Sequence, residues 1–396
     1  MRTNANLRMN TNLRITTNGK KRILIFSVAY LPFVGGAEVA VKKLTDHLGD
    51  YDFDLVTVNL DGKQKTSETI GRVNVYRVGR GTVGKYLFPI SGFLKARQLH
   101  KENSYDLTWA IMASYAGLAG LFFKKRFSKI PLVLTLQEGD PLPYVKKRMG
   151  VLLPLFKSLF KNADKITAIS NYLADWGREM GARVPVEVIP NGVDIFWFDP
   201  KQTPISSTRE SFWRAKRKNF DAKVVLITTS RLVHKNAIDM VIRSLVELPT
   251  DVHFVILGDG PKRSELKALA EHLALSDRVH FEGFIKNSSI IHYLRHSDIF
   301  IRPSRSEGMG NSFIEAMAAG LPVIATPVGG IVDFLKDGET GLFCEVDNPK
   351  SIAQKMEKLM KDVESRDYIV ANASKMVAEK YDWSLIAEKM RKVLGD

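Results

Sequence analysis

Short apolar runs alternate with helix-like segments along most of this chain, and that alternation limits the fold more than any other feature. A continuous apolar run bounded by polar residues indicates a parallel strand that is buried on both faces. Strand and helix in strict turn predict a doubly wound α/β sheet. In the first half, the expected strands are residues 22–28, 53–58, 73–78, 106–111, 131–136, 165–169 and 186–189.

The alternation stops once and then starts again. Residues 195–222 contain Pro200, Pro204 and a basic cluster without a sustained period, so they are interpreted as a linker. A chain of 396 residues is long enough for two domains that each bury a core. The expected strands of the second series are residues 223–229, 251–257, 278–284, 298–302 and 322–326.

The first twenty residues contain no acidic residue and no apolar core, so they are predicted to be a disordered tail rather than a signal peptide. Helical segments are expected to close the chain near residues 363–379 and 383–394. The predicted division is a tail (1–20), an N-terminal domain (21–195), a linker (196–222), a C-terminal domain (223–381) and a last helix (382–396).

Composition places the chain among globular proteins, with 45% hydrophobic and 26% charged residues. No run reaches the ~18 apolar residues of a membrane span. The single cysteine, Cys344, excludes an intrachain disulfide and a cysteine metal cluster, and it fits a reducing compartment. A cytoplasmic protein is therefore expected.

The positive charge is concentrated in the first half, where residues 1–200 hold 29 Lys and Arg against 17 Asp and Glu. This excess predicts an acidic partner or an anionic surface. Residues 144–161 alternate cationic and bulky apolar side chains, and as a helix they could lie on an anionic bilayer, with residues 124–126 adding charge. A helix that faces the core with a solvated basic edge fits the pattern equally well.

One stretch, residues 302–315, predicts a strand, a glycine-rich turn at Gly308 and Gly310, and a helix over residues 312–319. Such a turn presents free backbone N–H groups and the positive end of a helix dipole to an anion. Glu307 and Glu315 frame it, at a separation of roughly 12 Å if the residues between them are helical. A lone pair of acids at this spacing is most often a solvated helix start.

The stretch, which continues to Thr326, resembles the donor-site motif of retaining glycosyltransferases of family 4, and the resemblance covers residues 21–396. It implies the GT-B architecture: two Rossmann-like doubly wound parallel-sheet domains face each other across a cleft, and the C-terminal helix crosses back to the first. It also implies that Glu315 binds the ribose hydroxyls and that Glu307 contacts the transferred sugar. The residues implied to bind the diphosphate and the base are Gly308, Met309, Gly310, Asn311, Gly258, Phe284 and Ile285.

Family members supply positive charge to the leaving diphosphate with an Arg and a Lys after the first strand of the second domain. Arg231 matches that Arg, whereas the usual Lys position holds Asn236, so Lys235 is assigned to the phosphate. No cofactor and no metal are expected, and the lone D-x-D at residues 52–54 is interpreted as structural. His292 and His296 have metal-ligand spacing but lack a third ligand, so an exposed helix face is predicted.

The first domain supplies the other side of the implied cleft. Gly35 and Gly36 resemble the family's glycine loop, and residues 135–140 end a strand at the edge where doubly wound folds place ligands. Many relatives carry a His where this chain has Gln137, which leaves the roles of the neighbouring acids open. The residues expected at the cleft or acceptor side are Gly35, Gly36, Glu38, Gln137, Glu138 and Asn191.

The resemblance implies a retaining, metal-independent glycosyltransferase that moves a hexose-type sugar from a UDP- or GDP-linked donor to a lipid-linked or glycan acceptor. A peripheral contact with an anionic membrane is a further expectation. A nucleotide-sugar epimerase or a phosphorylase on the same fold is the alternative, but the Glu307 and Glu315 frame favours transfer. A basic nucleic-acid-binding protein is the other class, and no helix-turn-helix, zinc-finger or RNP-like pattern supports it.

Overall fold

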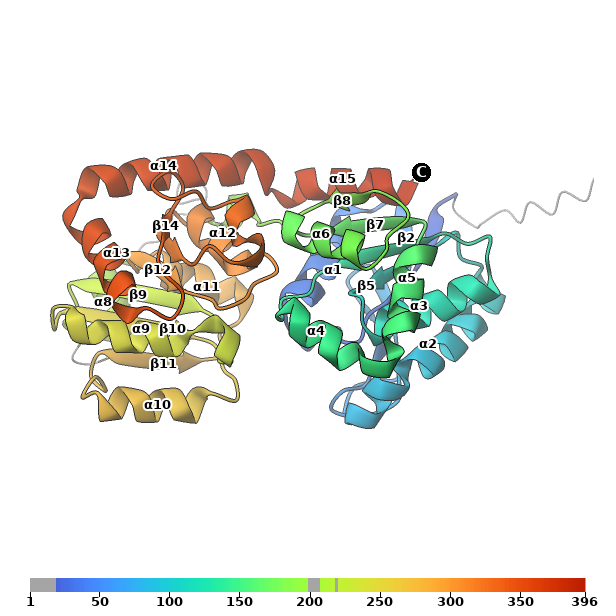
Figure 1. The fold of residues 1–396 in the computed structure, drawn as a ribbon, viewed down its shortest axis with the longest axis horizontal. Helices are drawn as coiled ribbons and strands as arrows, with labels where there is room; N and C mark the ends of the chain where they lie inside the picture. Colours follow the sequence, from blue (N-terminus) through green and yellow to red (C-terminus); the bar gives the residue numbers. More distant parts are fainter. Residues whose placement is uncertain (1–18, 199–206, 218–219, 396) are drawn as a thin grey trace, which may run out of the picture.

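The computed structural model describes residues 19–198, 207–217 and 220–395, so most of the predicted tail lies outside the described residues. Two lobes stand side by side, and each is a sheet covered by helices (Figure 1). The long helices near the C-terminus run along one side of both lobes (Figure 1). The arrangement confirms the predicted pair of α/β domains.

The N-terminal domain holds an eight-stranded sheet in the order β3-β4-β2-β1-β5-β6-β7-β8. All of its neighbouring strands are parallel except β3 and β4. The strands are β1 Lys21–Phe26, β2 Tyr51–Val58, β3 Ser67–Ile70, β4 Val73–Val78, β5 Leu107–Ile111, β6 Leu132–Leu136, β7 Lys165–Ala168 and β8 Val186–Val188. The helices are α1 Gly36–His47, α2 Gly81–Asn103, α3 Tyr115–Arg126, α4 Leu142–Met149, η1 Gly150–Leu152, α5 Leu153–Asn162, α6 Asn171–Glu179 and α7 Ile195–Phe198.

The C-terminal domain holds a six-stranded parallel sheet in the order β11-β10-β9-β12-β13-β14. Its strands are β9 Val224–Thr229, β10 Val252–Leu257, β11 Val279–Gly283, β12 Ile299–Arg302, β13 Val323–Ala325 and β14 Leu342–Phe343. Its helices are α8 Arg209–Lys216, η2 His234–Asn236, α9 Ile238–Ser244, η3 Leu245–Glu247, α10 Arg263–His272, α11 Asn287–Leu294, α12 Asn311–Ala318, η4 Gly329–Asp333, α13 Pro349–Lys361 and α14 Val363–Lys380. Helix α15, Trp383–Gly395, follows.

The central strands are buried on both faces, as their apolar runs predict. Residues 23–26 of β1 are fully buried. Side chains of α1 and α15 pack on one face of the sheet, and side chains of α2 and α3 pack on the other. The short strands β3 and β14 were not predicted, because β3 is polar and half-exposed and β14 has only two residues.

The last helix crosses from the C-terminal domain back to the N-terminal domain, which confirms the predicted crossover (Figure 1). The chain passes Val193 at the crossing: the N–H of Val193 donates to the carbonyl of Tyr381 at 2.7 Å, and the N–H of Trp383 donates back to Val193 at 3.3 Å. Trp383 is buried in the core that α1 and β1 share. The crossover therefore ties the two domains together.

Two local predictions were wrong. His296 does not lie on an exposed helix face, because α8 covers it: the ring of Phe212 stacks on the imidazole at 4.2 Å. Residues 144–161 do not form one helix, because Gly150 takes a φ of +48° and separates α4 from α5. Phe156 and Phe160 of α5 then point into the core.

Candidate functional site

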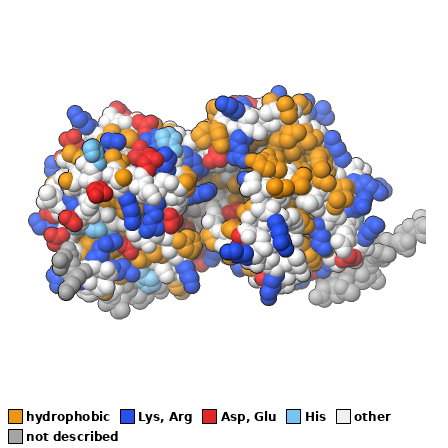
Figure 2. Space-filling model, turned by 90° about the horizontal axis from the view of Figure 1, so that it is seen from below, with side chains coloured by type: hydrophobic (Ala, Val, Ile, Leu, Met, Phe, Trp, Pro, Cys, Tyr) orange, Lys and Arg blue, Asp and Glu red, His pale blue; other side chains and the backbone are white. Residues whose placement is uncertain are grey.

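The two domains meet at the carboxyl ends of their parallel strands, where doubly wound folds bind ligands. Figure 2 shows the surface hollowed between the two lobes. Three loops carry most of the sequence-predicted residues. They are the β12–α12 loop (residues 303–310), the β9–α9 loop (residues 230–237) and the β6–α4 loop (residues 137–141).

Arg302, at the end of β12, holds the β12–α12 loop in place. Its side chain is buried, and Nη2 donates to Glu307 Oε2 at 2.8 Å. Nη1 donates to the carbonyl of Thr229 at 3.2 Å and to Ser312 Oγ at 2.7 Å. The guanidinium lies 4.3 Å from the centre of the Phe313 ring. One side chain thus fixes β9, the loop and α12 relative to each other, and the sequence reasoning missed it.

The two predicted carboxylates have different environments. Both oxygens of Glu307 are engaged, since Oε1 accepts from the N–H of Gly308 at 3.0 Å and Oε2 accepts from Arg302. Glu315 is half-buried in α12, and its carboxyl has no hydrogen bond or ion pair with the described residues. Burial raises the pKa of Glu315 to about 7, against the opposing charges of Arg302 and Lys43. Glu315 is therefore a free acceptor at the domain interface.

The N-terminus of α12 lies between Glu307 and Glu315. Gly310 precedes the helix with a φ of +89°, and a Cβ there would meet Phe313 and Arg302. The N–H groups of Met309, Gly310 and Asn311 find no acceptor among the described residues. They offer positive partial charge to an anion at this point.

The two domains approach each other closely at Gly308. A Cβ on Gly308 would lie 2.3 Å from the carbonyl oxygen of Glu138, so a larger residue would push the domains apart. Nearby, Ser306 Oγ donates to the carbonyl of Gly139 at 3.5 Å. The β12–α12 loop of one domain and the β6–α4 loop of the other therefore form one unit.

The structure places Lys235, and not Asn236, at the site. Lys235 Nζ lies 3.4 Å from Asp140 Oδ1. A Cβ on Gly139 would be 2.8 Å from Lys235 Nζ and 3.5 Å from Glu307 Oε1, so both groups approach the same point. Asn236 is buried, and its amide donates to the carbonyl of Arg231 at 2.7 Å.

Arg231 has no ion pair and no side-chain hydrogen bond within the described ranges, and it is exposed. Its loop is held in place by Gly258, whose φ is +137° and whose Cβ would collide with the carbonyl of Ser230. Phe284 and Ile285 lie beyond β10, at the end of β11, with Phe284 exposed. The predicted base segments thus border the β9–α9 loop on the side away from Glu307.

Arg305 joins the β9–α9 loop to the β12–α12 loop. Its guanidinium donates to the carbonyl of His234 at 2.6 Å and to Asp239 at 2.8 Å, and its Nε lies 2.6 Å from Asp347. Its backbone N–H donates to the carbonyl of Lys235 at 2.7 Å. The two acids raise the pKa of the Arg305 guanidinium. Arg305 thus holds the β9–α9 loop, with Lys235, beside the β12–α12 loop. This role was not predicted from the sequence.

A polar chain crosses the interface on the N-domain side. Asn191 Nδ2 donates to Asn311 Oδ1 at 3.1 Å and to Gln137 Oε1 at 3.4 Å. A Cβ on Gly36 would lie 3.7 Å from the amide nitrogen of Asn311. The predicted residues Gly36, Gln137 and Asn191 are therefore brought to the N-terminus of α12.

Two further predicted acids belong to the N-domain wall. Glu138 is buried, and its Oε1 accepts from the N–H of Ala113 at 2.6 Å, while Oε2 has no partner in the described residues. Burial raises the pKa of Glu138 to about 7. Glu38 is folded back against Gly35, and burial raises its pKa as well.

The D-x-D at residues 52–54 lies away from these loops. Asp54 accepts from Tyr105 Oη at 2.6 Å and from Asn74 at 2.9 Å inside the N-terminal domain. The described residues hold no group of three His, Cys, Asp or Glu that could bind a metal. Within the same residues, no helix is long and apolar enough to cross a membrane.

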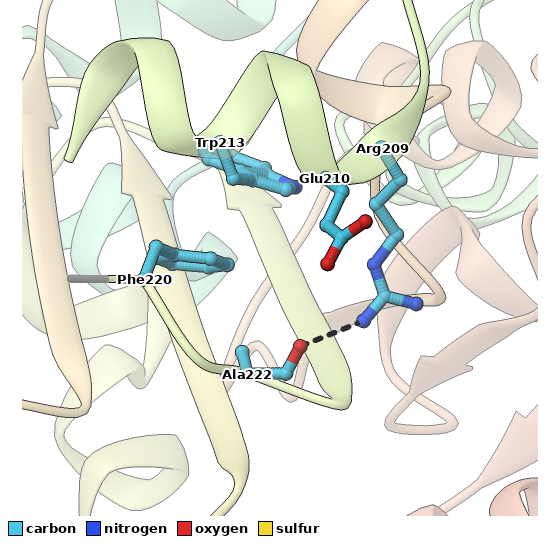
Figure 3. Close-up of a pocket in the computed structure, with 5 residues that line it drawn as sticks. All are labelled: Arg209, Glu210, Trp213, Phe220 and Ala222. Carbon is cyan, nitrogen blue, oxygen red and sulfur yellow. Dashed lines mark hydrogen bonds between the residues drawn. The ribbon is translucent and has the colours of Figure 1, made fainter. Parts of the chain in front are cut away.

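The cavity in Figure 3 is separate from these loops. It has a volume of about 230 Å³ and lies between α8 and the start of β9, where Arg209 donates to the carbonyl of Ala222. Strand β9 begins next to this cavity and runs parallel to β12, whose carboxyl end leads into the β12–α12 loop. The cavity therefore lies at the opposite edge of the sheet from the candidate site.

Two family models match the chain. "Glycosyltransferase Family 4" matches residues 34–195, and "Glycosyl transferases group 1" matches residues 209–376. Together they cover more than four-fifths of the chain, one for each domain. The chain belongs to the family 4 glycosyltransferases of the GT-B fold.

Curated relatives and a solved structure agree with this assignment. Alpha-monoglucosyldiacylglycerol synthase of Streptococcus pneumoniae is 27% identical over 77% of this chain and 70% of its own. GDP-mannose-dependent alpha-(1-6)-phosphatidylinositol monomannoside mannosyltransferase of Mycobacterium tuberculosis is 26% identical over 76% and 79%. HepE of Anabaena, in complex with UDP-glucose, has the same fold with a TM-score of 0.78 at 21% identity, over 94% and 99%.

Replacing Arg302 by Met in this glycosyltransferase should lower the free energy of unfolding by about 3–5 kcal/mol, because Glu307 loses its buried partner. The double variant Arg302→Met/Glu307→Gln should recover most of that loss, since no unpaired charge remains, yet it should not recover turnover of a nucleotide-sugar. Denaturant unfolding measures the change in stability, and the amount of nucleoside diphosphate formed measures turnover. Equal destabilisation of the single and double variants would contradict the pairing.

Proposed function

We propose that this enzyme moves a hexose from a UDP- or GDP-linked donor to a lipid-linked acceptor, with retention of anomeric configuration and without a metal ion. The supporting observation is the convergence of Lys235, the free N–H groups of α12 and two carboxylates at the domain interface. A nucleotide-sugar carries matching groups in the same order, with ribose and sugar on either side of an anionic diphosphate. Charge and shape of the site thus favour this class of ligand.

The ribose is assigned to Glu315. Its carboxylate is unpartnered among the described residues, so it can accept hydrogen bonds from the two ribose hydroxyls. The diphosphate is assigned to the N-terminus of α12 and to the cations of the β9–α9 loop, Arg231 and Lys235. Relatives that bind or depend on nucleotide-sugars support the donor class, since HepE is solved with UDP-glucose and the mycobacterial enzyme depends on GDP-mannose.

Departure of the nucleoside diphosphate places negative charge on the phosphate oxygen that leaves the sugar. Lys235 and the α12 N–H groups are positioned before the reaction, and preorganised positive groups of this kind lower the barrier where charge develops. Arg231 adds a second cation from the same loop as Lys235. They provide the charge that a metal ion supplies in other transferases. No metal is therefore required in the proposed mechanism.

The way in which Glu307 is held supports the proposed retention. Because Arg302 and the N–H of Gly308 engage its two oxygens, Glu307 is suited to orient the sugar hydroxyls rather than to attack the anomeric carbon. The acceptor hydroxyl then approaches from the face that the phosphate leaves, and the leaving phosphate oxygen takes the hydroxyl proton. The new glycosidic bond replaces the bond to phosphate on the same face.

A lipid-linked acceptor is the proposed second substrate. The pneumococcal relative is named as a synthase of monoglucosyldiacylglycerol, and the mycobacterial relative as a mannosyltransferase for a phosphatidylinositol monomannoside. Cys344 is the single cysteine and is free and buried, which suits the reducing cytoplasmic side of a membrane. The acceptor would reach the donor along the N-domain side of the interface.

A thermal-shift panel with UDP, GDP and ADP, with and without chelator, tests the donor site. A nucleotide at ~100 times its dissociation constant should add roughly 2.7 kcal/mol to the folded protein. One of the three should raise the melting temperature of the wild type with chelator present, and should fail to do so with Glu315→Ala. Arg231→Ala should reduce the shift, whereas Arg243→Ala, an exposed arginine in the last turn of α9, should keep it.

The proposal fails if none of the three nucleotides stabilises the wild type, or if the effect disappears with chelator. A shift that survives unchanged in Glu315→Ala would place the nucleotide elsewhere. Arg243→Ala controls for the loss of one positive charge from the same domain.

Nucleotide affinity should depend on pH through Glu315. Because its pKa is raised to about 7, the carboxylate is ionised above that pH and takes up a proton below it. Only the ionised form accepts both ribose hydroxyls, so apparent affinity should fall about tenfold between pH 8 and pH 6. Calorimetric titration of Glu315→Gln over the same range should give a flatter profile. Identical slopes for the two proteins would remove Glu315 from the binding step.

A further inference from the structure

Helix α2 is apolar on two opposite faces, and in the part of the chain that the structure describes only one of them is covered. Side chains such as Phe88 and Leu99 are buried against the sheet and α3. The outward face repeats at helical spacing and is exposed: Val83 69%, Tyr86 57%, Leu87 54%, Ile90 58% and Leu94 47%. A helix that is apolar all round is normally buried on both sides. None of the described residues covers the outward face, so a partner is expected there.

The segment formed by α4 and η1 extends this surface. Tyr144, Val151 and Leu152 are exposed there, with Val151 95% exposed. The ring of Tyr86 contacts that of Tyr115 at 5.4 Å, and the charge of Arg148 in α4 acts on Tyr115 and on Lys85 in α2. Both helices lie on the same side of the domain as α3 (Figure 1). We define the apolar face as Val83, Tyr86, Leu87, Ile90, Leu94, Tyr144, Val151 and Leu152.

Figure 2 views the molecule from the side on which α2, α3 and α4 lie in Figure 1. It shows hydrophobic side chains gathered over the N-terminal domain, with Lys and Arg side chains around them. Scattered apolar residues are ordinary on a protein surface, whereas a gathered field with a polar rim indicates an interaction site.

The charge around the apolar face is strongly positive. Residues 81–161, which contain α2 to α5, hold 13 Lys and Arg against 4 Asp and Glu. Lys147 and Lys157 have no ion pair among the described residues, and Lys146 pairs with the exposed Glu179. The partner must therefore offer an apolar layer bordered by negative charge. An anionic lipid bilayer has this arrangement.

A second copy of the chain fits less well. Two identical apolar faces that meet about a twofold axis would bring the same cationic rims together, and like charges would oppose the contact. A bilayer places negative headgroups where this dimer would place more lysines. Charge complementarity thus favours lipid.

The apolar face also borders the donor site. Helix α4, which carries Tyr144, begins directly after the β6–α4 loop. Asp140 of that loop lies 3.9 Å from Arg148 of α4 and 3.4 Å from Lys235 of the β9–α9 loop. A surface that rests against α2 and α4 would therefore lie beside the interface at which sugar transfer is proposed.

We propose that the apolar face seats the N-terminal domain on an anionic bilayer, with its apolar side chains at the acyl boundary and the surrounding cations on lipid phosphates. The seating brings the mouth of the domain interface to the membrane surface, so that a lipid-linked acceptor can enter without leaving the bilayer. The contact itself goes beyond the proposed function, since it concerns attachment and not the reaction.

Co-sedimentation with vesicles tests the proposal without donor or acceptor, so its failure is distinct from failure of glycosyl transfer. Vesicles of phosphatidylcholine alone are compared with vesicles that contain about one-third phosphatidylglycerol. The second composition gives the vesicle surface a negative charge roughly like that of a cytoplasmic membrane leaflet. Wild type should bind the anionic vesicles at least about tenfold more tightly, and added salt should weaken the binding. Leu87→Asp/Ile90→Asp should lose at least about tenfold in affinity.

The matched control is Val363→Asp/Leu385→Asp, which adds the same two charges at exposed apolar positions on α14 and α15. These helices run along the opposite side of the molecule (Figure 1). The control should bind vesicles like wild type, and both variants should keep the wild-type melting temperature, which shows that they are folded.

Three results would overturn the proposal. One is equal binding of wild type and Leu87→Asp/Ile90→Asp to the anionic vesicles. Another is an equal loss in the control variant, which would show that added charge acts anywhere on the surface. The third is a wild-type dimer, detected by light scattering without lipid, that Leu87→Asp/Ile90→Asp dissociates, since a second copy would then cover the face.

Discussion

The buried guanidinium of Arg302 is the interaction on which the proposed donor site depends. It contacts the end of β9, Glu307 and the first turn of α12, and so connects the three parts that are proposed to surround a nucleotide. Burial lowers the pKa of this guanidinium, and the nearby Glu307 and Glu315 oppose that effect. Burying this charge costs free energy, and its pairing with Glu307 offsets that cost. The pair therefore fixes one geometry of the β12–α12 loop but adds little net stability to the fold.

The second constraint is the close contact between the two domains. Gly308 lies against the carbonyl of Glu138, and Asn171 at the start of α6 donates its N–H to the carboxylate of Asp333 in η4 at 2.7 Å. Helix α15 adds a third connection, because its apolar side packs into the N-domain core. The site is therefore assembled from both domains, and changes in their relative position would alter Lys235, Glu307 and Asn191 together.

The helices and strands could be predicted because buried parallel strands are continuous apolar runs. The runs in β1 and β10 are too apolar to belong to exposed segments. The residues that are proposed to face a shared ligand were predicted from a resemblance that places them in one motif. Arg302 and Arg305 were not found, since their burial depends on partners distant in the sequence, such as Thr229 and Asp347. The burial of His296 was not predicted for the same reason, because the helix that covers it, α8, lies in the predicted linker.

A crystal structure with a bound nucleoside diphosphate tests the central claim most directly. The account predicts ribose hydroxyls on Glu315, and diphosphate oxygens about 3 Å from Lys235 Nζ, from Arg231 and from the N–H groups at the start of α12. It also predicts that Arg302 keeps its bond to Glu307. A nucleotide bound away from α12, or a diphosphate whose charge is met by a metal ion in place of Lys235 and Arg231, would contradict the account.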